Sequence, residues 1–153
     1  MHRLFLTIAF SLGLITSASL TALAENGTIV KESNRSVSET ITLLEETLKS
    51  KGITIFARID HAAGASKVDQ SLRPTELLIF GNPKLGTPLM QSNQAVGVDL
   101  PLKALAYEDE AGKVYLVYND PKYLSERHDL GEKAKVIEKI SGALSKFSDI
   151  ATK

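Results

Sequence analysis

The sequence has 153 residues, with 18 Lys and Arg balanced by 18 Asp and Glu, and it contains neither Cys nor Trp. Hydrophobic residues make up 43% and charged residues 24%, which is typical of one globular domain and unlike disordered or fibrous chains. The absence of Cys excludes a disulfide framework, a thiolate metal site and a thiol nucleophile. The balanced charge argues against a nucleic-acid partner, because nucleic-acid binding needs clustered positive charge.

Residues 1–24 have the pattern of a secretory signal peptide. Arg3 provides a basic start, residues 4–15 form a mostly apolar core, and Ala22-Leu23-Ala24 matches the small-x-small cleavage pattern. A membrane-spanning helix needs about 20 apolar residues, so we expect cleavage after this segment and no membrane anchor. The mature chain, 25–153, is then expected to be a single exported domain, periplasmic or secreted.

The mature chain begins with a pattern typical of a strand followed by a helix. Residues 28–33 predict a short strand. Ser36 and Glu39 have the spacing of a capping box, in which a hydroxyl and a carboxylate close the start of a helix. Apolar residues then recur at helical spacing up to Gly52, so we expect a helix over 37–51.

Two strands and two short helices are expected next. Residues 53–60 alternate as a strand with one apolar face, and residues 75–80 are apolar on both faces, as in an interior strand. A short helix over 68–72 is expected between these strands. The Thr-Pro pair at 87–88 resembles an N-cap and a first helical residue, which predicts a short helix over 88–94.

The C-terminal third predicts a β-hairpin and two helices. Strands over 102–108 and 113–119 are joined by a turn at Gly112, and a short helix over 121–127 precedes a longer one over 132–151. The complete order is strand, helix, four strands, helix. This order predicts an α+β fold, in which one antiparallel sheet of about five strands carries the helices on one face.

His61 is a candidate for chemistry because of its neighbours. It follows the strand over 53–60 and precedes the small residues 62–65, so we expect its imidazole to border a cavity. A ring nitrogen would then transfer a proton or bind haem iron. The alternative is that His61 orders the strand exit through a hydrogen bond. His128, the other His of the mature chain, is expected at the surface or at a helix end.

The loop over 81–87 follows a strand and contains two Gly five residues apart. It lacks the Lys that a phosphate-binding P-loop places between its second Gly and the hydroxyl residue, so nucleotide hydrolysis is not supported. Backbone N–H groups at the helix start, assisted by Lys84, would still suit an anion, and the alternative is a tight turn. Arg73 is a candidate clamp for a carboxylate or phosphate, or a tie to Asp60 or Asp99.

Several segments occur in a characteristic order: Ile59-Asp60-His61, Leu72-Arg73-Pro74-Thr75, Ile79-Phe80-Gly81-Asn82-Pro83-Lys84, Gly86-Thr87-Pro88-Leu89-Met90, Asp99-Leu100-Pro101-Leu102 and Tyr118-Asn119-Asp120-Pro121. Together they resemble the DUF302 family of uncharacterised prokaryotic proteins. The resemblance implies a compact α+β domain with an antiparallel sheet and association as dimers, but no established activity. The recurrent polar positions that it implies are His61, Arg73, Thr75, Asn82, Lys84, Thr87, Asp99 and Glu108.

Three functions are compatible with these features. The first is an exported, non-catalytic module for a small apolar or anionic ligand held between sheet and helices, with haem on His61 as one variant. Its expected ligand-binding residues are His61, Arg73, Thr75, Asn82, Lys84 and Asp99. The second is an enzyme in which His61 acts as general base and Arg73 anchors an anionic substrate. The third is a homodimer formed through the sheet or the hairpin edge.

Overall fold

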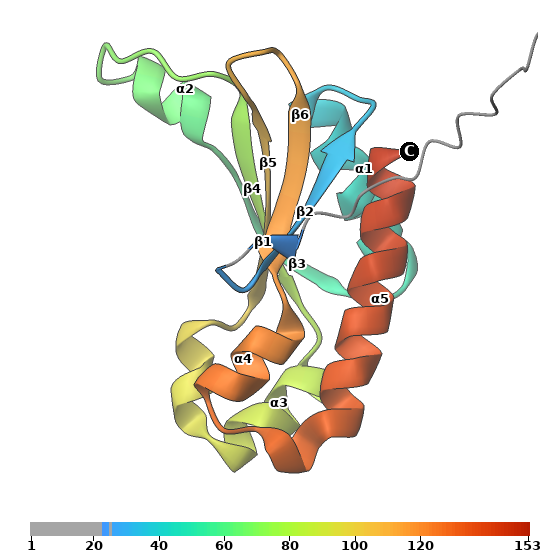
Figure 1. Cartoon of the computed structure of the whole chain (residues 1–153). Coiled ribbons are helices and arrows are strands. Elements are labelled where there is room, and N and C mark those ends of the chain that lie inside the picture. The colour runs from blue at the N-terminus through green and yellow to red at the C-terminus, as the bar shows by residue number, and fades with distance from the viewer. Residues whose placement is uncertain (1–22, 25) are drawn as a thin grey trace, which may run out of the picture.

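The computed structural model describes residues 23, 24 and 26–153. It shows an antiparallel sheet in the order β1-β2-β6-β5-β4-β3, with helices against it (Figure 1). The strands are β1 (Leu23–Ala24), β2 (Thr28–Ser33), β3 (Thr54–Asp60), β4 (Thr75–Gly81), β5 (Leu102–Glu108) and β6 (Val114–Asn119). The helices are α1 (Val37–Ser50), α2 (His61–Ser66), α3 (Pro83–Ser92), α4 (Pro121–Arg127) and α5 (Ala134–Thr152), with 3-10 helices η1 (Gln94–Val98) and η2 (Gly131–Lys133). The expected α+β fold is confirmed, and β1 adds a two-residue pair beside the five expected strands.

Helix α1 begins where the capping box predicts. The Glu39 N–H donates to Ser36 Oγ at 3.3 Å, and the Ser36 N–H donates to Glu39 Oε2 at 3.0 Å. The hydrogen bond from the Ser36 hydroxyl, followed by the one from its N–H, holds the pKa of Glu39 below its usual value, since both favour the carboxylate. The apolar stripe of α1 that the spacing predicts is buried; its residues are Val37, Ile41, Leu44 and Leu48.

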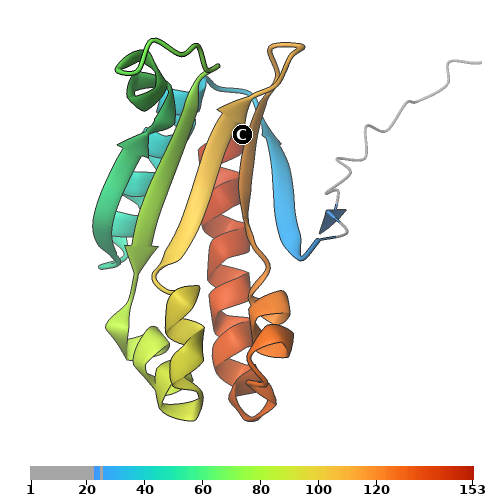
Figure 2. The same ribbon diagram turned by 90° about the vertical axis from the view of Figure 1, so that its left-hand side faces the viewer.

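The two long helices cover the same face of the sheet, as the element order predicts (Figure 2). Helix α1 packs on β3, β4 and β5, whereas α5 packs on β2 and along α1. The core between the two layers includes the fully buried Leu78 of β4 and Leu116 of β6. Helix α2 lies at one end of the sheet, and α3, η1 and α4 gather at the other end (Figure 1). The opposite face of the sheet carries no helix in the described part of the chain (Figure 2).

The edge strand β3 departs from the simple alternation expected over 53–60. Its pairing with β4 shifts after Ile55, which makes Phe56 the extra residue of a bulge. A shift of one residue moves the following side chains to the other face of a sheet. Ile55 therefore shares the helix-covered face with its partner Phe80, whereas Ile59 pairs with Leu77 on the face without helices. The expectation of one apolar face along the whole segment is wrong.

The expectation of a short helix over 68–72 is also wrong. Helix α2 instead starts directly after β3, because Asp60 Oδ1 accepts the Ala63 N–H at 2.8 Å and caps a helix at His61. Val68 and Leu72 are exposed in the loop that leads to β4.

Helix α3 begins earlier than the expected range of 88–94. Asn82 rather than Thr87 is its N-cap, and Pro83 occupies the first helical position, where a missing N–H has no cost. Pro88 consequently lies inside the helix. The sequence contains two cap-proline pairs five residues apart, and the one closer to the end of β4 starts the helix.

The C-terminal elements agree with the sequence analysis. Gly112 turns the β5–β6 hairpin with a φ of +78°, and Asp120 caps α4 by accepting the Lys122 N–H at 2.9 Å. Helix α5 covers the expected range to within two residues. Within the described residues no helix is both long and apolar enough to cross a membrane. The expected signal peptide falls mostly on residues 1–22, outside the described part.

The two-layer core generates a stability prediction. Leu78 is completely buried, so Leu78→Ala is expected to lower the free energy of unfolding by about 2–5 kcal/mol through lost burial and the cavity that remains. Leu72→Ala is the matched control: its side chain is 48% exposed, and we expect a change within about 0.5 kcal/mol. Urea unfolding followed by circular dichroism measures both. Equal effects of the two substitutions would contradict the described core.

Candidate functional site

Three of the six candidate residues lie at the α2 end of the sheet. His61 is the exposed first residue of α2, and Arg73 is exposed just before β4. The Arg73 Nε donates to the Glu108 carbonyl at 3.1 Å, and the Thr75 hydroxyl donates to the Arg73 carbonyl at 3.0 Å. Arg73 also lies 4.0 Å from a carboxylate oxygen of Glu110. It therefore connects two loops, but its partners are not Asp60 or Asp99, the carboxylates that were expected.

His61 was expected to border a cavity, and the structure places it away from the apolar cleft. Its side chain is on the surface, and His61 is absent from the lining of the apolar cleft described below, which lies at the other end of the sheet. A haem ring needs an apolar enclosure around its axial ligand, and the surroundings of His61 do not fit such a group.

Asp99 belongs to a polar cluster, the Asp99–His128 clasp, which joins the end of η1 to the end of α4. Asp99 Oδ2 and His128 Nε2 share a hydrogen bond at 2.6 Å, and Arg127 Nη1 lies 3.4 Å from Asp99 Oδ1. The side chains of His128 and Asp99 are only 8% and 13% exposed. Asn93 Nδ2 donates to the His128 carbonyl at 2.9 Å. The clasp thus fixes the chain that leads from η1 into β5; His128 is at a helix end, as expected, but is buried.

Asn82 and Lys84 lie at the start of α3, where the sequence suggested an anion cradle. The Lys84 N–H donates to Asn82 Oδ1 at 3.0 Å, and the N–H groups of Leu85 and Gly86 both donate to the Asn82 carbonyl at 2.9 Å. Pro83 has no N–H to offer. The first turn of α3 therefore has its donors occupied, which favours the alternative of a capped tight turn.

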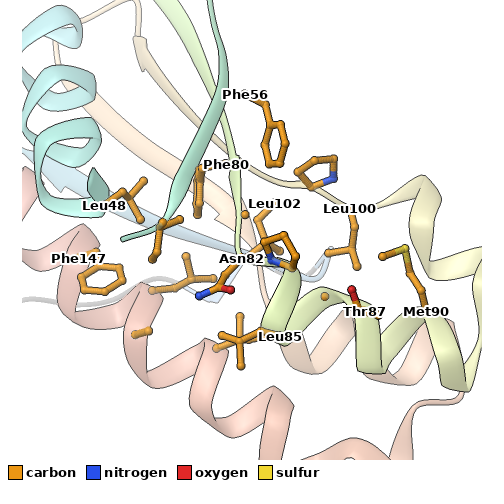
Figure 3. Close-up of a pocket in the computed structure, with 18 residues that line it drawn as sticks. Leu48, Phe56, Phe80, Asn82, Leu85, Thr87, Met90, Leu100, Leu102 and Phe147 are labelled. Atoms are coloured by element: carbon orange, nitrogen blue, oxygen red, sulfur yellow. The ribbon is translucent and has the colours of Figure 1, made fainter. Parts of the chain in front are cut away.

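An apolar cleft of about 240 Å³ lies between the α3 end of the sheet and helix α5 (Figure 3). The end of β4, the start of β5, α3 and α5 all contribute to its walls. Its lining residues are Leu48, Ile53, Phe56, Phe80, Gly81, Asn82, Pro83, Leu85, Gly86, Thr87, Met90, Leu100, Pro101, Leu102, Ile140, Ala143, Leu144 and Phe147. An apolar cavity of about 150 Å³ accepts benzene, so this cleft has room for a somewhat larger molecule.

Only two of the lining side chains are polar, and none is titratable. The carboxamide of Asn82 lies centrally among the apolar side chains, and Thr87 lies beside Leu100 and Met90 (Figure 3). Asn82 Oδ1 is engaged with Lys84, but neither Asn82 Nδ2 nor the Thr87 hydroxyl bonds to a protein group within 23–24 and 26–153. Those residues also contain no group of three His, Asp or Glu suited to a metal ion. The cleft can therefore hold an apolar body and one polar group.

Asn82 was predictable from the sequence as a site residue, whereas the apolar lining was not. Leu85 and Met90 fell in a segment interpreted as a turn and a later helix, so their common role was hidden. The apolar positions of α3 carried the signal: a short amphipathic helix beyond the end of a sheet needs an apolar neighbour. Phe147 was placed in the stripe of α5, but its position opposite α3 depends on the tertiary fold.

A domain of unknown function, DUF302, matches residues 29–147, which span β2 to most of α5. The chain belongs to the DUF302 family. A solved structure of an uncharacterised conserved DUF302 protein from Bacillus stearothermophilus has the same fold, with a TM-score of 0.73 at 20% identity. It covers 82% of this chain, and this chain covers 98% of it. The resemblance drawn from the sequence motifs is therefore confirmed.

Curated relatives of this DUF302 chain include two named fluoride-specific ion channel FluC 1. The protein of Brucella suis biovar 1 (strain 1330) is 44% identical over 133 residues, which is 84% of this chain and 52% of the relative. The protein of Brucella abortus biovar 1 (strain 9-941) is also 44% identical over 133 residues, 84% of this chain and 49% of the relative. The chain thus spans about half the length of the curated relatives it matches.

Proposed function

We propose that this DUF302 protein is a non-catalytic module that binds a small, mainly apolar molecule in the cleft beside α3. One observation carries the proposal: a concave site of about 240 Å³ is lined by apolar side chains and only two polar ones. Small-molecule sites typically combine such an apolar surface with a few polar groups that orient the ligand. Of the six ligand-binding residues expected from the sequence, Asn82 lines this cleft.

The enzyme alternative has less support. It requires His61 and Arg73 to act together on an anionic substrate, but both are exposed at the α2 end of the sheet, and Arg73 is engaged with the Glu108 carbonyl. Haem on His61 is not part of the proposal, because the cleft contains no His.

The names of the curated relatives bring fluoride into consideration, but this chain spans only about half of their length. Those relatives are about twice as long as the matched region, so their channel activity is a property of whole proteins. The cleft has no cationic side chain, whereas a small anion needs positive charge or several donors to replace its water. We propose that a domain of this kind works beside a channel as a ligand-binding module and does not bind fluoride itself.

Toluene titration followed by amide and methyl NMR tests the cleft. We expect toluene to cause saturable shifts at Leu85, Met90 and Phe147. Sodium fluoride, added with the ionic strength held constant, should cause no shifts at these residues. Ala143→Leu adds three carbons to the cleft wall and should weaken toluene binding about tenfold, which corresponds to about 1.4 kcal/mol.

The matched control is Ala63→Leu, the same change on exposed α2. It should leave toluene affinity unchanged. Toluene shifts that are absent, or unaffected by Ala143→Leu, would exclude ligand binding in this cleft.

We also propose that the protein is exported and that residues 1–24 are removed. Cleavage after Ala24 would leave 153 − 24 = 129 residues and remove β1, so β2 would become the sheet edge. Intact-mass measurement of the protein from the periplasm or medium should give a chain that begins at Glu25. A full-length mass in the cell interior would contradict export.

A second candidate role, association with a second copy, is favoured by the sheet face that lacks helices. Five residues on this face are direct cross-strand partners and form one aliphatic row across β2, β6, β5, β4 and β3; they are Val30, Val117, Leu105, Leu77 and Ile59. Tyr107 and Tyr115 flank the row, with ring centroids 5.6 Å apart. An apolar centre with a more polar margin is typical of an interface.

The area of this face is enough for a dimer whose interface is at the small end of the range of specific interfaces. Five strands about 4.8 Å apart and about 20 Å long present about 500 Å² per copy, and a specific interface needs at least about 1,000 Å² in total. A two-fold axis through the row would place the same side chains against each other, as in an isologous dimer.

Light scattering after size exclusion should therefore give twice the monomer mass. Leu105→Lys places a charge at the centre of the row and should yield monomers that keep the native circular dichroism spectrum. Val98→Lys, on a 71% exposed side chain of η1, is the control and should remain dimeric. A monomeric wild-type protein at about 100 μM, a concentration at which even a weak small interface would be occupied, would exclude this role.

A further inference from the structure

The two polar groups of the cleft define a narrower class of ligand, and this inference rests on the proposed function. We infer that the cleft selects an uncharged molecule of about ten non-hydrogen atoms that carries one hydrogen-bond acceptor.

The size follows from the volume. Benzene, with six carbons, occupies an apolar cavity of about 150 Å³. By proportion, about 240 Å³ accommodates about ten such atoms. A bicyclic aromatic ring, a substituted benzene or a chain of eight to ten carbons has this size, whereas haem or a phospholipid is too large to be enclosed by the cleft.

The absence of charge follows from the donors around the cleft. None of the lining side chains is cationic, and the N–H groups of Lys84, Leu85 and Gly86 already donate to Asn82. A carboxylate or phosphate placed here would exchange its water for at most two neutral donors, Asn82 Nδ2 and the Thr87 hydroxyl, with no cation beside it, which is unfavourable. Lys84 itself is exposed and does not line the cleft.

The acceptor follows from Asn82. Its Oδ1 already accepts the Lys84 N–H, whereas its Nδ2 makes no hydrogen bond within the described residues, so Nδ2 is the group of Asn82 that most needs a partner. The Thr87 hydroxyl can donate or accept, so it does not exclude a ligand with an acceptor. A ketone, ester, ether or phenol oxygen satisfies Asn82 Nδ2, whereas a pure hydrocarbon leaves this half-buried donor without a partner.

Three probes of nearly equal size separate these properties: acetophenone is neutral with one acceptor, ethylbenzene lacks the acceptor, and benzoate is an anion. Dissociation constants from NMR titrations of the wild-type protein at pH 7 should place acetophenone about three- to tenfold tighter than ethylbenzene, the contribution of one hydrogen bond. Benzoate should bind more weakly than both.

Asn82→Ser identifies the donor. Ser is an equally good N-cap, so α3 should keep its start while the amide donor is removed. We expect acetophenone to lose its advantage over ethylbenzene, while ethylbenzene affinity stays within about twofold of wild type, since its contacts are apolar. Thr87→Val, a change of similar shape, reports the contribution of the hydroxyl and provides a second test that does not depend on the cap.

The control is Asn34→Ser, the same substitution in the exposed loop between β2 and α1, which should retain the acetophenone preference. Benzoate binding equal to or tighter than acetophenone, or equal affinity for acetophenone and ethylbenzene, would overturn this inference and leave the proposed function intact. Failure of all three probes to bind would overturn the proposed function as well.

Discussion

The length of α5 relative to the strands is the constraint on which the rest of the structure depends. Its 19 residues span about 28 Å at 1.5 Å per residue, whereas a strand of seven residues spans about 23 Å. One end of α5 therefore extends beyond the sheet (Figure 1). Its buried residues at that end, Ile137 and Ile140, need another apolar neighbour, and α4 and η2 pack against α5 there.

The cleft lies where these two packing arrangements meet. The sheet ends at Gly81, and α3 starts two residues later at an angle set by the Asn82 cap and Pro83. Two Gly along this junction, Gly81 and Gly86, contribute no side chain; a Cβ on Gly86 would lie 3.7 Å from Leu100 Cδ1. Leu85 of α3 and Phe147 of α5 both line the cleft that remains beyond the end of the sheet. The Asp99–His128 clasp holds the far wall in place, because it joins η1 to α4 through a nearly buried polar contact.

Much of the fold was predictable because local signals and tertiary packing agree. The capping box at Ser36, the interior strand at 75–80 and the hairpin turn at Gly112 each act through neighbouring residues, and all were found from the sequence. The bulge at Phe56 was not found, since pairing with β4 produces it and the local alternation does not show it.

The site was less predictable than the fold for a physical reason. Polar residues at strand ends attract attention in a sequence, but His61, Arg73 and Thr75 serve exposed turns, and Asp99 serves a structural clasp. The cleft is made of ordinary apolar residues from four distant segments, which are indistinguishable from core residues until the chain folds. Of the polar positions that the sequence motifs singled out, Asn82 and Thr87 have a place in the site.

Asn82 therefore connects the stability of the fold to the chemistry of the cleft. Its Oδ1 and carbonyl start α3, and its Nδ2 is the donor that the cleft offers. A substitution of Asn82 that removed the cap would displace α3, and with it Leu85 and Met90. Loss of binding in such a variant would therefore not distinguish a structural role of Asn82 from a role in ligand recognition. Substitutions that keep a cap oxygen separate the two, because the wall of the cleft then persists while the donor is removed. The same reasoning explains why the apolar lining and the single donor belong to one site: both depend on the angle at which the chain leaves β4.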